Sequence, residues 1–281
     1  MNAVIVVGTD GSAGATRAVM WAAQDAALKR SRLQIAHVLE TARADVPYNP
    51  PREVAERLLA EAARSARELG PAVEVTVRLL AGHPATELRA LAENADELVV
   101  GSRGLGGFAS ALLGSVSLGV AGRVHRPVVV VRPAAAAQGA AAQGAAAQAE
   151  IVVGVDGSAD SEAALEYAVT EAALRQAPLR VVRAWQVPPH VMSFDPLAAQ
   201  QEQAELVADL LAPWRDKHPE VSFTKDVVCA HPAAALVNAS KNATLVVVGS
   251  RGRGQFAAAV LGSVSHGVLC HAHCPVAVVR R

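Results

Sequence analysis

The sequence predicts two tandem α/β domains, each an open parallel five-stranded sheet with helices on both faces. Three observations predict this fold class. The motif Val-Gly-x-Asp-Gly-Ser occurs at 7–12 and again at 153–158, and a glycine-rich stretch at 101–117 recurs at 249–265. In each copy, short β-branched runs alternate with segments of helical length, a pattern typical of parallel sheets with crossover helices. A repeat of about 150 residues indicates duplicated domains, because solenoid units are about 20–50 residues long.

The elements of the first half follow from local pattern. Asp10-Gly11-Ser12 is a turn, and Ser12 is a good N-cap for a helix over 13–30. Pro84 suits the first turn of a helix over 84–95, while the three prolines within 41–51 indicate a loop. Further helices are expected over 53–69 and 115–124. Buried strands are expected at 3–7, 33–39, 73–80, 98–100 and 128–131, and near 151–155, 179–185, 222–228, 245–249 and 276–279 in the second half.

Domain boundaries follow from a low-complexity stretch between the two halves. Residues 133–149 consist almost entirely of Ala, Gln and Gly and present no packing face. This composition predicts a linker. We therefore expect domain one at 1–132 and domain two at 150–281.

Composition excludes several classes of function. The chain has 26 Lys and Arg against 26 Asp and Glu, so it lacks the basic excess expected of a nucleic-acid or membrane-surface binder. It has three cysteines, Cys229, Cys270 and Cys274, an odd and sparse set that favours a reducing compartment. The chain shows no signal-peptide pattern and no run long enough to span a membrane. We expect a cytoplasmic protein.

The glycine-rich stretch has the spacing Gly-x2-Gly-x9-Gly-Ser in both copies. Gly101 and Gly104 are expected to adopt positive φ and to bring the backbone close to a ligand. Gly114-Ser115 is expected to open a helix, whose amide groups and dipole favour an anion. The hydroxyl groups of Ser115 and Ser117 would add donors. A phosphate group is the predicted ligand.

Asp10 follows the first strand, and the glycine-rich stretch follows the fourth. Ligands of open α/β sheets bind beyond the carboxyl ends of the strands, where the strand order reverses. If the two strands are neighbours, Asp10 could accept hydrogen bonds from a ribose while the glycine-rich stretch holds phosphates. Asp10 could equally serve only an Asx turn. Its recurrence as Asp156, with a second glycine-rich stretch, favours ligand binding.

These motifs resemble those of the universal stress protein family, in its tandem-domain, ATP-binding type, over nearly the whole chain. The resemblance implies a Rossmann-like sheet of order 3-2-1-4-5, with Asp10 and Asp156 at the ribose, the main chain near Val38 and Ala184 at the adenine, and the glycine-rich stretches at the phosphates. It also implies pairing of the two fifth strands and further dimerisation. The expected cofactor-binding residues are Gly8, Asp10, Val38, Gly101, Ser102, Arg103, Gly104, Gly114, Ser115, Val116 and Ser117, with Gly154, Asp156, Ala184, Gly249, Ser250, Arg251, Gly252, Gly262, Ser263, Val264 and Ser265.

Neither glycine-rich stretch contains Asp, Glu, His or Lys. Phosphoryl transfer depends on positioning and on charge stabilisation by metal ions and cations. Each stretch offers mainly one cation, Arg103 or Arg251, with Arg253 in addition in the second. We therefore expect no catalytic residues and at most slow hydrolysis. Mg²⁺ is expected to be held mainly by the phosphates, since no dedicated carboxylate cage is evident.

Other polar segments have simpler explanations. Cys270 to Cys274 nominally has zinc-ligand spacing, but the first copy lacks these ligands and the end of a helix explains the segment. His83-Pro84 and His231-Pro232 are expected to start helices. Tyr48 and Phe194, in the loops after each second strand, fit an adenine lid, a partner contact or no role.

The sequence thus predicts an ATP-binding stress-response regulator with one adenine-nucleotide site per domain. Nucleotide occupancy would change the loops 41–51 and 186–196, or a homodimer surface, and so alter binding to an unidentified protein partner. The copies differ at Leu105, which is Arg253 in the second, and at Gly107, which is Gln255, so equal affinity is in doubt. A slow ATPase or nucleotidyltransferase and a scaffold with vestigial sites are the alternatives.

Overall fold

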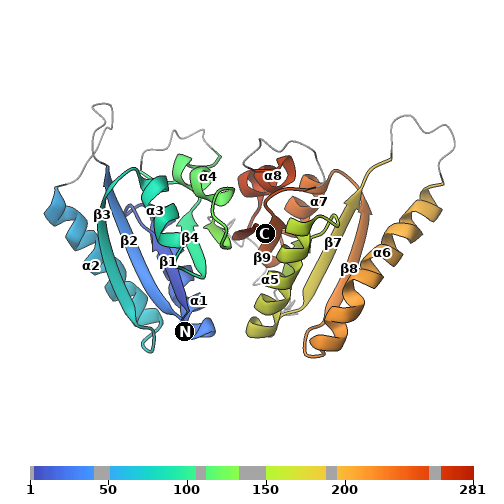
Figure 1. The fold of residues 1–281 in the computed structure, drawn as a ribbon, viewed down its shortest axis with the longest axis horizontal. Coiled ribbons are helices and arrows are strands. Elements are labelled where there is room, and N and C mark those ends of the chain that lie inside the picture. Colours follow the sequence, from blue (N-terminus) through green and yellow to red (C-terminus); the bar gives the residue numbers. More distant parts are fainter. Residues whose placement is uncertain (1–2, 41–50, 106–111, 133–149, 188–194, 253–260) are drawn as a thin grey trace, which may run out of the picture. The chain divides into compact units, whose positions relative to one another are not determined.

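The chain divides into two compact units, residues 1–133 and 134–281. A computed structural model describes residues 3–40, 51–105, 112–132, 150–187, 195–252 and 261–281 (Figure 1). The predicted linker 133–149, Tyr48, Phe194 and the differing positions 107, 253 and 255 lie outside the described residues. Within these ranges, every helix is too short or too polar to cross a membrane.

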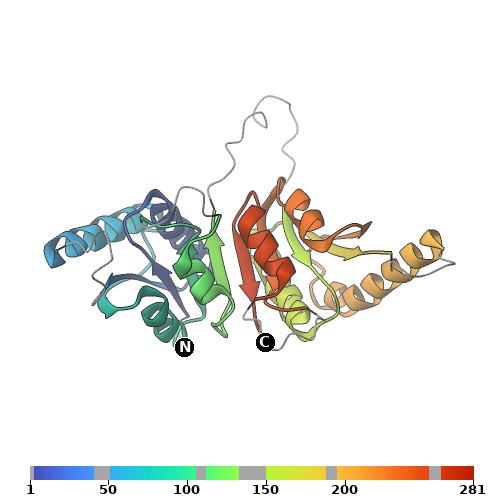
Figure 2. The ribbon, with the colours of Figure 1, turned by 90° about the horizontal axis from the view of Figure 1, so that it is seen from above.

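The first unit is a five-stranded parallel sheet in the order β3-β2-β1-β4-β5. The predicted α/β class, and the order implied by the resemblance, are confirmed. Helices lie on both faces of the strands (Figure 2). Its elements are β1 (Val4–Gly8), α1 (Ala13–Lys29), β2 (Arg32–Glu40), α2 (Arg52–Leu69), β3 (Val75–Gly82), α3 (Pro84–Ala92), β4 (Glu97–Gly101), α4 (Ser115–Ala121) and β5 (Val128–Val131).

The second unit repeats this architecture. Its parallel strands have the order β8-β7-β6-β9-β10, which is the same 3-2-1-4-5 order. Its elements are β6 (Glu150–Gly154), α5 (Ala159–Arg175), β7 (Leu179–Trp185), α6 (Pro196–Lys217), β8 (Phe223–Cys229), α7 (Pro232–Ala239), β9 (Ala243–Gly249), α8 (Ser263–His271) and β10 (Val276–Val279).

Capping and burial explain the elements. The Ser12 hydroxyl accepts a hydrogen bond from the Ala15 amide, and Ser158 caps α5 in the same way. Pro84 and Pro232 occupy the first turns of α3 and α7, as predicted. The central strands are almost wholly buried Val, Ile and Leu, as expected for a sheet covered on both faces.

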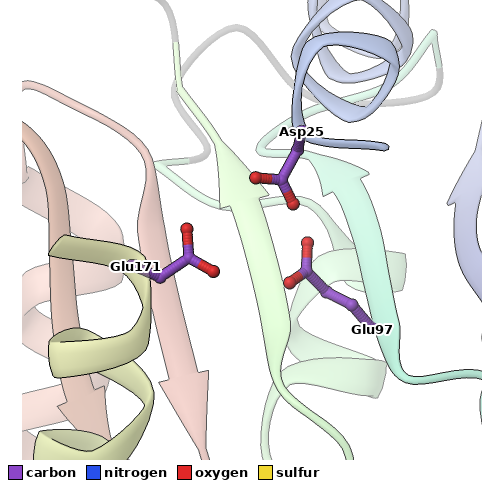
Figure 3. Close-up of side chains that lie close together, drawn as sticks. All are labelled: Asp25, Glu97 and Glu171. Atoms are coloured by element: carbon purple, nitrogen blue, oxygen red, sulfur yellow. The ribbon is translucent and has the colours of Figure 1, made fainter. Parts of the chain in front are cut away.

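Two neighbouring buried carboxylates in the first domain depart from the apolar pattern. Glu97, placed by the sequence just outside the fourth strand, is the first residue of β4 and is 2% exposed. Its carboxylate faces that of Asp25, which is 1% exposed on α1 (Figure 3). The Lys29 ammonium lies 2.6 Å from Glu97 and 2.7 Å from Asp25. The buried carboxylates are tolerated because a cation lies within bonding distance of both.

Both first helices end in the same strained backbone conformation. Arg30, at the C-cap of α1, has φ of 50°, and Gln176, at the C-cap of α5, has φ of 51°. A left-handed conformation costs an L-residue about 1–2 kcal/mol, whereas glycine adopts it freely.

We therefore expect Arg30→Gly to raise the free energy of unfolding, by about 0.5–1 kcal/mol after the greater entropy of the unfolded glycine chain is subtracted. Arg30→Ala is the matched control, because it removes the same exposed side chain and keeps the strain. Thermal unfolding of the three proteins measures the difference. A glycine variant no more stable than the alanine variant would contradict the prediction.

Candidate nucleotide site

The two recurring motifs meet at the carboxyl edge of the sheet. Because β1 and β4 are neighbours, the turn after β1 lies beside the stretch after β4. Asp10 joins them: its Oδ1 accepts from the Ser12 amide at 2.9 Å, and its Oδ2 accepts from the Leu105 amide at 2.8 Å. The Asx turn and the juxtaposition of the motifs are therefore both present. A carboxylate offers about four lone-pair positions, so Asp10 keeps acceptor capacity for a ligand.

In the second domain, the turn after the first strand is again closed by its aspartate, Asp156. The Oδ1 of Asp156 accepts from the amide of Ser158 at 2.9 Å and from its hydroxyl at 2.6 Å. A Cβ added at Gly252 would lie 2.5 Å from Asp156 Oδ2. The acidic side chain thus directly contacts the glycine-rich stretch here as well.

Gly101 and Gly104 of the first glycine-rich stretch allow close approach of the backbone to neighbouring groups and do not adopt a left-handed conformation. Among the described residues, the glycines with positive φ are Gly11, Gly82 and Gly157, so the predicted positive φ at Gly101 and Gly104 is wrong. A Cβ added at Gly104 would lie 2.2 Å from Asp10 Oδ2. The glycine is required because the carboxylate and the backbone approach closer than any side chain permits.

The serines of the glycine-rich stretches have different surroundings. Ser117 is buried and donates to the Gly101 carbonyl at 2.6 Å, and Ser265 donates to the Gly249 carbonyl at the same distance. Ser115 and Ser263 are exposed at the first positions of α4 and α8. The hydroxyls of Ser117 and Ser265 thus already close the loop, and the contribution of all four serines to phosphate binding stays a prediction.

Each loop is closed at its far end by the backbone. The Gly114 amide donates to the Ser102 carbonyl, and the Gly262 amide donates to the Ser250 carbonyl, both at 2.8 Å. The helices that follow begin without a side-chain cap. Their first amide groups therefore remain available to an anion, and the second residues of these helices are Val116 and Val264.

The expected adenine contacts lie on the strand beside β1 or β6. Val38 and Ala184 are partly exposed near the ends of β2 and β7. A Cβ added at Gly8 would instead lie 2.8 Å from the side chain of Leu88 in α3, and one added at Gly154 would lie 2.8 Å from that of Leu236 in α7. Their assignment to the ligand, like that of Val38 and Ala184, stays a prediction.

Sequence reasoning missed two polar residues at this edge. His37, buried on β2, has its Nδ1 2.7 Å from the Thr9 carbonyl and therefore donates to it. Asp160, in the first turn of α5, contacts the second glycine-rich stretch. Comparison of the two copies could have identified Asp160, because the first copy has Gly14 at the corresponding position.

The segment Cys270 to Cys274 is the end of a helix. α8 ends at His271, and both cysteines are buried. The Cys270 sulfur lies 3.8 Å from His266 Nε2. Among the described side chains, those of this segment do not gather into a group of three or more metal ligands.

Comparison with known proteins covers both domains. The model of the universal stress protein family matches residues 1–132 and 149–280. A universal stress protein of Mycobacterium tuberculosis is 36% identical over 293 residues, which cover 99% of this chain and 97% of that protein.

Solved structures are also similar. A universal stress protein from Archaeoglobus fulgidus has a TM-score of 0.71 and 22% identity, covering 99% of this chain and 96% of its own; this likeness shows the fold. A universal stress protein solved in complex with cAMP is 38% identical, with a TM-score of 0.39, over 47% of this chain and 97% of its own. By the family match to both halves and the full-length relative, the chain belongs to the universal stress protein family.

Proposed function

We propose that each domain binds one adenine nucleotide, with ATP as the principal ligand, and that occupancy regulates contacts with a protein partner in the cytoplasm. The observation that carries this proposal is the bond from the Leu105 amide to Asp10. It brings a carboxylate with spare acceptor capacity beside the loop that leads to α4, a helix whose first turn has no side-chain cap. This pairing suits a ribose hydroxyl next to a phosphate chain.

The proposed residue roles follow the surroundings of each group. Asp10 and Asp156 would accept from ribose hydroxyls, and the main chain at Val38 and Ala184 would face the base. The amide groups that begin α4 and α8, with Arg103 and Arg251, would hold the phosphates. Magnesium would bind to the phosphates and neutralise part of their charge. In the described ranges, no group of three carboxylate, His or Cys ligands gathers at these loops.

Binding without rapid turnover is the proposed outcome. The glycine-rich stretches contain no Asp, Glu, His or Lys to orient a water molecule. Asp160, which contacts the second stretch, is already an acceptor for backbone and hydroxyl groups. A slow ATPase is the alternative, and phosphate release within seconds in a single-turnover assay with labelled ATP would favour it.

We expect calorimetric titration of the full chain with ATP to show one binding event per domain, and denatured preparations to release adenine nucleotide. Guanosine nucleotides serve as the control, since only the base differs. Titrations that stay flat, together with extracts free of nucleotide, would refute the proposal.

The regulatory part has its own test. Limited proteolysis at the loops 41–51 and 186–196 is expected to change when ATP is added. An ATP-binding protein whose cleavage pattern is identical with and without ATP would contradict regulation through these loops while leaving nucleotide binding intact.

A further inference from the structure

The first turns of α1 and α5 differ at one position that touches the glycine-rich stretch. The first copy reads Ser-Ala-Gly-Ala at 12–15, and the second reads Ser-Ala-Asp-Ser at 158–161. Asp160 is 8% exposed, which is unusual for a carboxylate and requires polar partners.

Asp160 obtains these partners from the second glycine-rich stretch and from the C-terminal residue. Its Oδ2 accepts from the Ser250 hydroxyl at 2.7 Å and from the Arg251 amide at 3.1 Å. Its Oδ1 accepts from the Arg281 amide at 3.2 Å. The Arg251 Nε lies 3.8 Å from Oδ2, within ion-pair distance.

The first domain lacks this carboxylate. A Cβ added at Gly14 would lie 2.6 Å from the Arg103 carbonyl, so a side chain does not fit there without movement. The Arg103 guanidinium is exposed, and neither it nor the Arg103 amide has a hydrogen-bond or ion-pair partner within the described ranges. Two donors that Asp160 engages in the second domain are thus available in the first.

Phosphate oxygens and a carboxylate compete for the same donors, since both are anions that take charge-assisted hydrogen bonds. A carboxylate beside the loop also repels each phosphate charge, the more so where water is excluded. We propose that Asp160 is a specificity-determining residue of the second domain: it competes with phosphate for Arg251 and shifts this site toward adenine nucleotides with fewer phosphates, whereas the first domain, with Gly14, favours ATP. This inference rests on the proposed function.

The experiment compares ligands that differ in phosphate charge. ATP, AMP and adenosine are titrated into full chains carrying Gly104→Val, which disables the first site, with either Asp160 or Asp160→Asn. Asparagine keeps the shape and an acceptor oxygen but removes the charge. We expect the ratio of ATP to adenosine affinity to rise about tenfold, equivalent to about 1.4 kcal/mol, in the Asn variant, with a smaller rise for AMP. Arg253 is present in both chains and cancels in the comparison.

Ser161→Ala is the matched control. It gives position 161 the alanine that the first copy has at position 15, and it changes no charge. The ratio of ATP affinity to adenosine affinity should therefore stay within about twofold of the parent value. An unchanged or lowered ratio in Asp160→Asn would overturn the inference. Absence of any adenine-nucleotide binding by the unmodified chain would instead refute the proposed function.

A second measurement avoids any folding defect at position 160. Arg103→Gln is expected to weaken ATP binding in the first domain about tenfold, and Arg251→Gln to weaken it less than about threefold in the second, because Asp160 already engages Arg251. Each loss is measured with the other site disabled by valine at Gly252 or Gly104. Equal losses would overturn the inference.

Discussion

Replacing Gly104 by valine is expected to abolish ATP binding in the first domain and to leave the second domain unaffected. A Cβ at this position would lie 2.2 Å from Asp10 Oδ2, so the carboxylate must move. Movement breaks its bonds to the amides of Leu105 and Ser12, which hold the loop against the turn. Hydrogen bonds to charged groups contribute about 1.5–3 kcal/mol each, so losing both weakens binding at least about 100-fold.

Calorimetry measures this effect as a halved stoichiometry with ATP. Gly252→Val should produce the mirror result, because its Cβ would lie 2.5 Å from Asp156 Oδ2, and the double variant should not bind. Leu105→Ala is the control: it removes an exposed side chain of the same loop and keeps the amide that donates to Asp10. Full stoichiometry in Gly104→Val would show that the loop does not hold the nucleotide.

The same variants distinguish a regulator from a scaffold with vestigial sites. A scaffold depends on the folded domains and not on their loops, so the double valine variant would retain every interaction with the protein partner. A regulator would lose the ATP dependence of that interaction. The comparison requires that the variants remain folded at the temperature of the assay, which thermal unfolding measures.

The fold was predictable because its signals are local and repeated. Alternation of β-branched runs with helical segments predicts a parallel sheet, and the caps at Ser12 and Ser158 fix where two helices begin. The adjacency of β1 and β4, on which the candidate site depends, came from the strand order implied by the family resemblance. Asp10 and Leu105 are far apart in sequence, and their contact depends on that adjacency.

The errors share a physical origin. A glycine that recurs in both copies can be required for a positive φ or for the space that a side chain would occupy. At Gly104 the requirement is space beside Asp10. Asp160 was missed because its partners, Ser250 and Arg251, are distant in sequence. The fourth strand was expected to begin at Leu98, whereas β4 begins at the charged residue Glu97, which Lys29 compensates in space.

The buried pair of carboxylates makes the loss of the Lys29 side chain costly to the stability of the first domain. In Lys29→Met, the carboxylates of Asp25 and Glu97 lose a cation that lies within 2.7 Å of each. Removing one partner from a buried ion pair typically costs about 3–5 kcal/mol. For a domain of this size, we expect a melting temperature lower by about 10 °C.

The second domain supplies the control, because one of its three corresponding residues carries no charge. Glu171 and Arg175 replace Asp25 and Lys29, and their side chains lie 2.9 Å apart, but Leu245 stands in place of Glu97. Glu97→Leu in the first domain should therefore be tolerated. Combined with Lys29→Met, it should recover part of the lost stability, because the double variant leaves one buried carboxylate without the lysine, whereas Lys29→Met alone leaves two. If the melting temperature of the single Lys29→Met variant equals that of the parent protein, the ammonium does not compensate these carboxylates.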